Sequence, residues 1–366
     1  MFERIKAARV IVSLLSVSLF AFGLAGCGSV GGGGDGSGSE VRIQGAGATF
    51  PNPLYQKWFS EYNRSHPNVK FDYQSIGSGG GIKQASEKTV DFGGTDAPMK
   101  DEDLAKVQGT IFHIPTVLGA VVITYNLPGV TAELHLTPEA IAGIYLGTIK
   151  KWNDPLIASA NPGVNLPDAA ITAVRRSDGS GTTFVFTDYL SKVSPAWKSG
   201  PGAGTSVGWP AGVGIGAKGN EGVTGQVKQT PNSIGYVELI YAEQNKMPVA
   251  SIKNSAGQMV RPALDSITAA AASVAGQMPD DMRVSITDAP GASAYPISSF
   301  TYLLVYKDQP DQAKGKALVD FLWWAVHDGE QMARDLLYAP LPQEVVQKAE
   351  ARINSITFQG KPLRQS

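Results

Sequence analysis

Cysteine, histidine and net charge are all scarce in this chain of 366 residues. The single cysteine allows no internal disulfide, so a hydrophobic core must stabilise the fold. The 31 basic and 32 acidic side chains nearly cancel, and no basic excess suggests a nucleic-acid surface. None of the four histidines has the spacing of a metal ligand. We therefore expect no metal, no cofactor and no nucleic-acid partner.

Residues 1–26 have the pattern of an export signal. Three basic side chains precede an apolar run over residues 10–24, which is too short for a dependable membrane-spanning helix. The run ends in Leu-Ala-Gly-Cys at Cys27, which resembles the lipobox of bacterial lipoprotein signal peptides. The resemblance implies cleavage before Cys27 and diacylglycerol on its thiol. The alternative is a buried, apolar thiol.

A flexible tether is expected next. Residues 28–39 are nearly all glycine and serine, and such a segment cannot bury enough surface to become ordered. We therefore assign residues 27–40 to the lipidated cysteine and its tether, and we expect folding to start at residue 41.

The rest of the sequence alternates between strand and helix patterns. Residues 69–73 alternate as a half-buried strand does. Aromatic side chains at Tyr55, Phe59 and Tyr62 recur on one face of a helix. The alternation predicts α/β sheets covered by helices. The Ala/Gly-rich residues 201–225 are instead interpreted as a loop with short helical turns.

Two long apolar β-type runs, residues 114–125 and 295–306, have the appearance of crossings between lobes. If both cross, the first lobe is discontinuous. The predicted division is a first lobe of residues 41–118 and 299–366, with residues 119–298 as the second lobe.

Four short segments share one pattern, a strand end followed by glycine or hydroxyl residues and a helix start: residues 45–50, 76–81, 92–96 and 175–183. Helix N-termini carry unpaired N–H groups and partial positive charge. Glycine lets an oxyanion approach that backbone, and serine or threonine adds a hydroxyl donor. One such loop is typical of ordinary α/β connections, but four with an adjacent arginine indicate an oxyanion site.

Nucleotide-binding and catalytic patterns are missing from these loops. Residues 179–182 lack the Gly-Lys-Ser/Thr ending of a P-loop, and no Gly-x-Gly-x-x-Gly opens a dinucleotide fold. Neither residues 77–81 nor residues 179–181 form the Gly-x-Ser-x-Gly elbow of a hydrolase. A binding protein is therefore favoured over an enzyme.

Six segments together resemble the PstS family, the phosphate-binding proteins of bacterial high-affinity phosphate uptake. The likeness extends from about residue 43 to residue 342, and its most specific part is Val-Arg-Arg-Ser-Asp-Gly-Ser-Gly-Thr, which begins at Val174. The segments are residues 45–53, 76–84, 90–98, 144–154, 174–186 and 233–238. The resemblance implies a type II periplasmic-binding-protein fold, with two α/β lobes joined by two hinge strands around one buried anion.

The resemblance also implies eight phosphate contacts, which are Thr49, Phe50 through its main-chain N–H, Ser78, Asp96, Arg176, Ser180, Gly181 and Thr182. All eight positions have the residue type that the family pattern requires. Gly79 departs from the pattern, because a second serine is common there. Position 95 varies in the family, so Thr95 does not weaken the resemblance.

The charged members of this set have distinct expected roles. Arg176 offers a two-pronged contact to the anion, and Asp178 is expected to orient it. The alternative for Asp178 is a surface acid at a helix start. Asp96 would repel an anion unless the anion carries a proton for the carboxylate to accept. Phosphate carries one near neutral pH and sulfate does not, so Asp96 is expected to exclude sulfate. Its alternative role is a helix N-cap.

The sequence therefore predicts a monomeric, lipid-anchored receptor on the extracytoplasmic or periplasmic side of the cell envelope. It would capture inorganic phosphate and deliver it to the permease subunits of an ABC importer with cytoplasmic ATPases. Three alternatives stay open. One is a binding protein for sulfate or molybdate, and another is a secreted phosphatase-type hydrolase that uses Ser78 or Ser180. The third is a phosphate sensor or adhesin with the same fold, which the sequence does not separate from a transport receptor.

Overall fold

The computed structural model describes residues 39–364, and Ser39–Ser366 forms one compact unit. The expected signal peptide (residues 1–26), Cys27 and nearly all of the tether (residues 27–40) lie outside the described residues. Within the part that is described, no helix has the length and apolar character needed to cross a membrane.

Helices and strands alternate along the chain as the sequence predicts. The strands are β1 (Val41–Gly47), β2 (Val69–Ser75), β3 (Phe92–Thr95), β4 (Ile111–Asn126), β5 (His135–Leu136), β6 (Thr172–Arg176), β7 (Ile215–Ala217), β8 (Ser233–Glu238), β9 (Ser251–Lys253), β10 (Met259–Val260), β11 (Ser298–Tyr306), β12 (Thr357–Phe358) and β13 (Lys361–Pro362). The helices are α1 (Asn52–Ser65), α2 (Ser78–Ser86), α3 (Asp101–Leu104), α4 (Pro138–Leu146), α5 (Pro155–Ala158), α6 (Gly181–Val193), α7 (Pro195–Ser199), α8 (Gly219–Gln229), α9 (Leu239–Gln244), α10 (Leu264–Ala272), α11 (Gln312–Ala325), α12 (Glu330–Asp335) and α13 (Gln343–Asn354).

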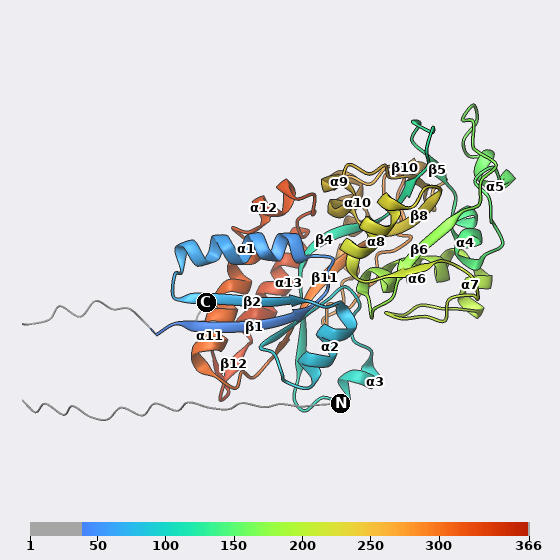
Figure 1. The fold of residues 1–366 in the computed structure, drawn as a ribbon. Helices are drawn as coiled ribbons and strands as arrows, with labels where there is room; N and C mark the ends of the chain where they lie inside the picture. Colours follow the sequence, from blue (N-terminus) through green and yellow to red (C-terminus); the bar gives the residue numbers. More distant parts are fainter. Residues whose placement is uncertain (1–38, 365–366) are drawn as a thin grey trace, which may run out of the picture. The chain divides into compact units, whose positions relative to one another are not determined.

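The main sheet has the strand order β2-β1-β3-β11-β4-β8-β6-β7. Strands β1, β2 and β3 run parallel to one another, and β11 is antiparallel to both β3 and β4. At the other end, β6 runs parallel to β7 and β8, and β8 is antiparallel to β4. We call β1, β2, β3 and their helices the first part, and β6, β7, β8 and their helices the second part (Figure 1).

Strand β4 belongs to both parts. Its residues from Ile111 to Ala120 pair with β11, and those from Val121 to Asn126 pair with β8. Every β4 residue except Asn126 is buried, which explains the unbroken apolar run, because both faces of the strand are covered. The predicted lobe boundaries at residues 118/119 and 298/299 stay a prediction.

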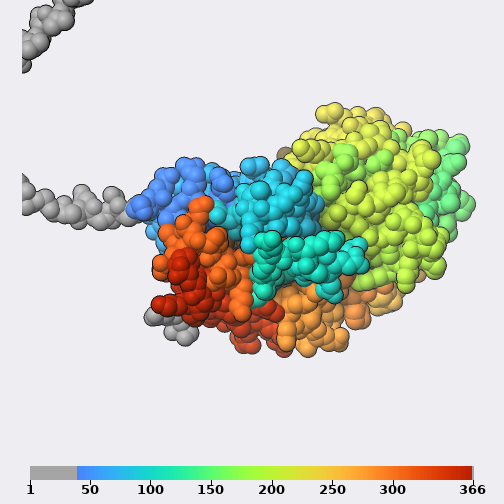
Figure 2. Space-filling model, turned by 90° about the horizontal axis from the view of Figure 1, so that it is seen from below, coloured from blue at the N-terminus to red at the C-terminus, as the bar shows by residue number. Residues whose placement is uncertain are grey.

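A second connection between the parts comes from residues 278–288, which we call the crossing segment. Its Arg283 donates hydrogen bonds to the carbonyl of Met99 and to Asp101 on α3, in the first part. Its Ser285 donates to Asp188 on α6, in the second part. Figure 2 shows this orange region beside the teal surface of α3 and below the yellow-green surface of the second part.

The loop predicted for residues 201–225 is wrong over residues 215–225. The structure has strand β7 at Ile215–Ala217 and the start of the eleven-residue helix α8 there. Strand β7 pairs with β6, and α8 buries Val223 and Val227. These tertiary contacts outweigh the weak helix propensity of a glycine-rich composition.

Candidate functional site

Three loops of the first part meet at one sheet edge, because β1, β2 and β3 are parallel. Thr49 and Phe50 follow β1, Ser78 opens α2 after β2, and Asp96 follows β3 directly. All four residues are at most 3% exposed. Gly47 allows the close approach of these loops: its φ is +149°, and a Cβ there would lie 2.1 Å from the carbonyl oxygen of Gly94.

The second part contributes one strand end and one helix start. Arg176 ends β6, and Ser180 is the N-cap of α6, where its side chain accepts a hydrogen bond of 3.0 Å from the Thr183 N–H. Gly181 and Thr182 form the first turn of this 13-residue helix, so their N–H groups have no partner within the helix. These groups provide the positive end of a helix dipole at the site.

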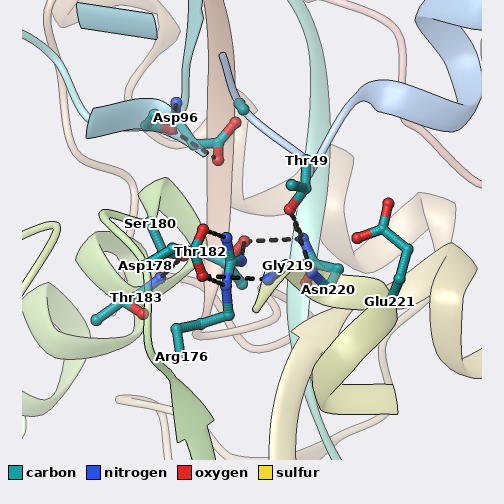
Figure 3. Close-up of polar contacts among 12 residues, drawn as sticks. Thr49, Asp96, Arg176, Asp178, Ser180, Thr182, Thr183, Gly219, Asn220 and Glu221 are labelled. Carbon is teal, nitrogen blue, oxygen red and sulfur yellow. Dashed lines mark hydrogen bonds and ion pairs between the residues drawn. The ribbon is translucent and has the colours of Figure 1, made fainter. Parts of the chain in front are cut away.

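The loops of the two parts touch. The Gly79 N–H donates a hydrogen bond of 3.0 Å to the carbonyl of Gly179. A Cβ on Gly181 would lie 2.3 Å from both Asp96 Oδ2 and Ser78 Oγ, so only glycine fits there. The structure thus brings all eight predicted contact residues into one buried cluster. Figure 3 shows five of them, which are Thr49, Asp96, Arg176, Ser180 and Thr182. Their part in binding stays a prediction.

Arg176 is held by two bonds from one side. Its Nε donates to Asp178 Oδ1 at 2.7 Å, and its Nη2 donates to Asp178 Oδ2 at 2.5 Å. Its Nη1 lies 3.4 Å from Thr182 Oγ1. Burial acts to raise the pKa of Asp178, but the hydrogen bonds and charge of Arg176 outweigh burial, and the pKa lies below its usual value. Asp178 therefore stays ionised and fixes the guanidinium plane.

Among the residues that the structure describes, no cation contacts Asp96 directly. Its Oδ1 accepts a hydrogen bond of 2.7 Å from the Thr301 hydroxyl, and Ser78 Oγ lies 3.5 Å from its Oδ2. Burial raises the pKa of Asp96 to about 7, although Thr301, the charge of Arg176 and Ser78 all act to lower it. The helix-cap alternative is wrong, because Lys100 is the N-cap of α3.

Sequence reasoning missed two polar residues of the site. Asn220, in the first turn of α8, donates to Thr49 Oγ1 and Thr182 Oγ1, and Thr301 on β11 donates to Asp96. The order of strand end, glycine and helix start also holds at Gly219 and could have revealed Asn220. Thr301 lies within an apolar strand and has no local signal.

Comparisons with known proteins agree on one kind of relative. Residues 33–328 match the family described as a PBP superfamily domain. The phosphate-binding protein PstS of Pasteurella multocida is 49% identical over 311 residues, covering 85% of this chain and 89% of that protein. The phosphate-binding protein PstS of Methanocaldococcus jannaschii is 38% identical and covers 95% of this chain and 93% of that protein. A solved phosphate-binding protein from Stenotrophomonas maltophilia has a TM-score of 0.66 at 22% identity, covering 85% of this chain and 94% of that one.

Proposed function

The chain belongs to the PstS family of phosphate-binding proteins, and on this premise we propose that it captures inorganic phosphate and delivers it to an ABC importer. Its fold is the type II periplasmic-binding-protein fold that the sequence predicts. The observation that supports phosphate most directly is the pair of Asp96 and Arg176 in one buried cluster. A cation attracts the anion, and a carboxylate accepts the proton that the anion carries.

The proposed contacts would satisfy every oxygen of a buried anion, which is required because an unpaired buried charge is costly. Donors from the first part are the hydroxyls of Thr49 and Ser78 and the N–H of Phe50. Donors from the second part are the Arg176 guanidinium and the helix start formed by Ser180, Gly181 and Thr182. Asp96 is the one proposed acceptor.

The other-oxyanion and hydrolase alternatives find less support. Sulfate and molybdate offer no proton near neutral pH, so the charge of Asp96 would repel them. A hydrolase would need one of the two serines as its nucleophile. Ser180 Oγ accepts a hydrogen bond from the Thr183 N–H, and Ser78 Oγ lies 3.5 Å from the Asp96 carboxyl. Neither contact is to a histidine base that would activate the serine. The relatives are named as binding proteins and not as enzymes.

Delivery requires the site to open and close. We propose that residues 41–118 and 299–366 form one lobe, that residues 119–298 form the other, and that both bend about β4 and β11. Hinge closure around a ligand is an ordinary motion of two-lobed proteins. The loop contacts between Gly79 and Gly179 belong to the closed arrangement.

The receptor is also proposed to be a monomer that is lipid-anchored through Cys27 on the extracytoplasmic or periplasmic side of the envelope. The support is the lipobox-like sequence followed by the glycine- and serine-rich tether. Cys27→Ser should abolish labelling by palmitate in growing cells and leave phosphate binding intact. Unchanged labelling would contradict the anchor.

One titration tests the ligand. Purified protein, stripped of bound phosphate, is titrated calorimetrically with phosphate, arsenate and sulfate. We expect tight binding of phosphate, binding of arsenate, which also carries a proton, and negligible binding of sulfate. Sulfate binding as tight as that of phosphate would overturn the proposal.

A further inference from the structure

Asn220 lies between two of the proposed phosphate contacts, one from each part of the molecule. Its Nδ2 donates to Thr49 Oγ1 at 2.7 Å and to Thr182 Oγ1 at 3.1 Å, and the residue is fully buried. Figure 3 shows the amide between the two threonines. The inference below rests on the proposed function.

The orientation of the Asn220 amide is fixed by a third contact. Its Oδ1 accepts a hydrogen bond of 2.9 Å from the Glu238 N–H. A backbone N–H can only donate, so the opposite orientation would set the side-chain NH₂ against another donor. The NH₂ group must therefore face the threonines.

Each threonine hydroxyl has both of its acceptor positions occupied. Thr49 Oγ1 accepts from Asn220 Nδ2 and, at 3.3 Å, from the Asn220 backbone N–H. Thr182 Oγ1 accepts from Asn220 Nδ2 and, at 3.4 Å, faces Arg176 Nη1. A hydroxyl has two acceptor lone pairs and one donor hydrogen, so each O–H is left only to donate.

We propose that Asn220 is a positioning residue that makes Thr49 and Thr182 obligate hydrogen-bond donors to the anion. A free hydroxyl can accept or donate, and it would tolerate a protonated oxygen of the ligand. Two hydroxyls locked as donors offer no acceptor for the proton of phosphate, so that proton is directed to Asp96. Asn220 and Thr182 both lie in the second part, whereas Thr49 lies in the first, so the polarity of Thr49 is set only when the loops meet.

The test replaces the donor amide by a carboxyl of the same shape. Asn220→Asp should weaken phosphate binding roughly hundredfold at pH 8, since a carboxylate is a pure acceptor and repels the anion. Asn220→Ala should weaken it about tenfold. Calorimetry at pH 8 and pH 5 gives the phosphate affinity of each variant relative to that of the wild type at the same pH.

A pH profile separates this role from mere structural support. The loss of phosphate affinity in Asn220→Asp should be smaller at pH 5, because a protonated carboxyl regains a donor. The affinity of Asn220→Ala relative to the wild type should be the same at both pH values. The ionisable groups around position 220 are the same in both variants, so the difference between the two pH profiles reports on the new carboxyl alone. These groups are Asp96, Arg176, Asp178, Glu221, Glu238 and Tyr241.

The matched control is Asn161, a buried asparagine that donates only to the carbonyls of His135 and Ile157. Asn161→Asp should lower the melting temperature and leave phosphate affinity unchanged.

If Asn220→Asp does not fold, a double-mutant cycle of Asn220→Ala and Thr182→Val tests the inference. The loss of phosphate affinity caused by Asn220→Ala should be smaller when the Thr182 hydroxyl is already absent. Strictly additive losses, or an Asn220→Asp variant that binds like the wild type, would overturn the inference. A wild type that does not bind phosphate would overturn the proposed function and this inference with it.

Discussion

Two aspartates on opposite sides of the site have opposite acidities. Asp96, on the first part, is 1% exposed, and burial raises its pKa to about 7. Asp178, on the second part, is also shielded from solvent, but its two bonds from Arg176 hold its pKa below the usual value. Burial pushes both in the same direction, and the cation in direct contact decides the outcome.

In the proposed function, this difference divides the work of recognition between the two parts. We propose that the second part attracts the anion with Arg176, which Asp178 orients while the Arg176 Nη1 stays directed at the site. We propose that the first part discriminates, because Asp96 favours a ligand that brings a proton. Attraction and selectivity should therefore be separable by mutation.

Removing the attraction should have the largest effect. Arg176→Ala should cost about 2–5 kcal/mol of phosphate binding, because the buried anion loses its charged donor. Arg176→Lys should restore only part of this loss, since an ammonium cannot form the fork. Calorimetric titration measures both. Arg175→Ala is the control, because that side chain lies over the Trp209 ring. Wild-type affinity in Arg176→Ala would place the anion elsewhere.

The discriminating carboxyl should make the unliganded protein less stable as pH rises. Folding shifts the pKa of Asp96 from 3.8 to about 7, so the native state binds the extra proton between these values. Stability is retained below pH 4 and lost as pH rises towards 7, by about 4 kcal/mol in total. Urea unfolding at pH 5 and pH 8 measures the part of the loss between these values, which is about 3 kcal/mol. Asp96→Asn should remove it, and an equal loss in the variant would contradict the account.

Asp178 should show the opposite sign. Its folded pKa is lowered, so it stabilises the protein above the usual aspartate pKa and loses this contribution as pH falls through its folded pKa. Asp178→Asn should abolish that acid-side loss and weaken phosphate binding by about 1 kcal/mol, because Arg176 keeps a neutral acceptor. Acid unfolding and titration check the two effects. A variant with the acid sensitivity of the wild type would break the contrast between the aspartates.

The smallest effect is expected at Thr301. Its hydroxyl lowers the pKa of Asp96 by donating to Oδ1. Thr301→Val should therefore move the upper end of the stability loss upward by about 1 pH unit, the equivalent of one hydrogen bond. The urea measurements at pH 5 and pH 8, repeated on this variant, should show a loss that is larger by about 1 kcal/mol. A loss equal to that of the wild type would mean that the bond does not set the acidity of Asp96.

The two long buried strands could be predicted, because strands covered on both faces are apolar throughout. The apolar runs at residues 114–125 and 295–306 correspond to β4 (Ile111–Asn126) and β11 (Ser298–Tyr306). Helix α8 could not be predicted from composition, because its stability comes from packing against β8 and pairing of the preceding β7 with β6.

The candidate site likewise has residues that could be predicted from the sequence and residues that could not. Residues in glycine-rich loops at strand ends, such as Ser78 and Arg176, were named from local pattern and family resemblance. Thr301 could not be named, because it reaches Asp96 from 205 positions away along the chain. Groups that tune a site through long-range contacts leave no local pattern.

Selectivity in Asp96→Asn tests the central claim most directly. Phosphate and sulfate affinities are measured by calorimetry on the wild type and the variant at one salt concentration and at pH 8, where the Asp96 carboxyl is ionised. We expect sulfate to gain at least about tenfold, because a like charge is removed, and phosphate to change less than that. The phosphate-to-sulfate ratio should therefore fall. An unchanged ratio would contradict the account, because selectivity would then not reside in Asp96.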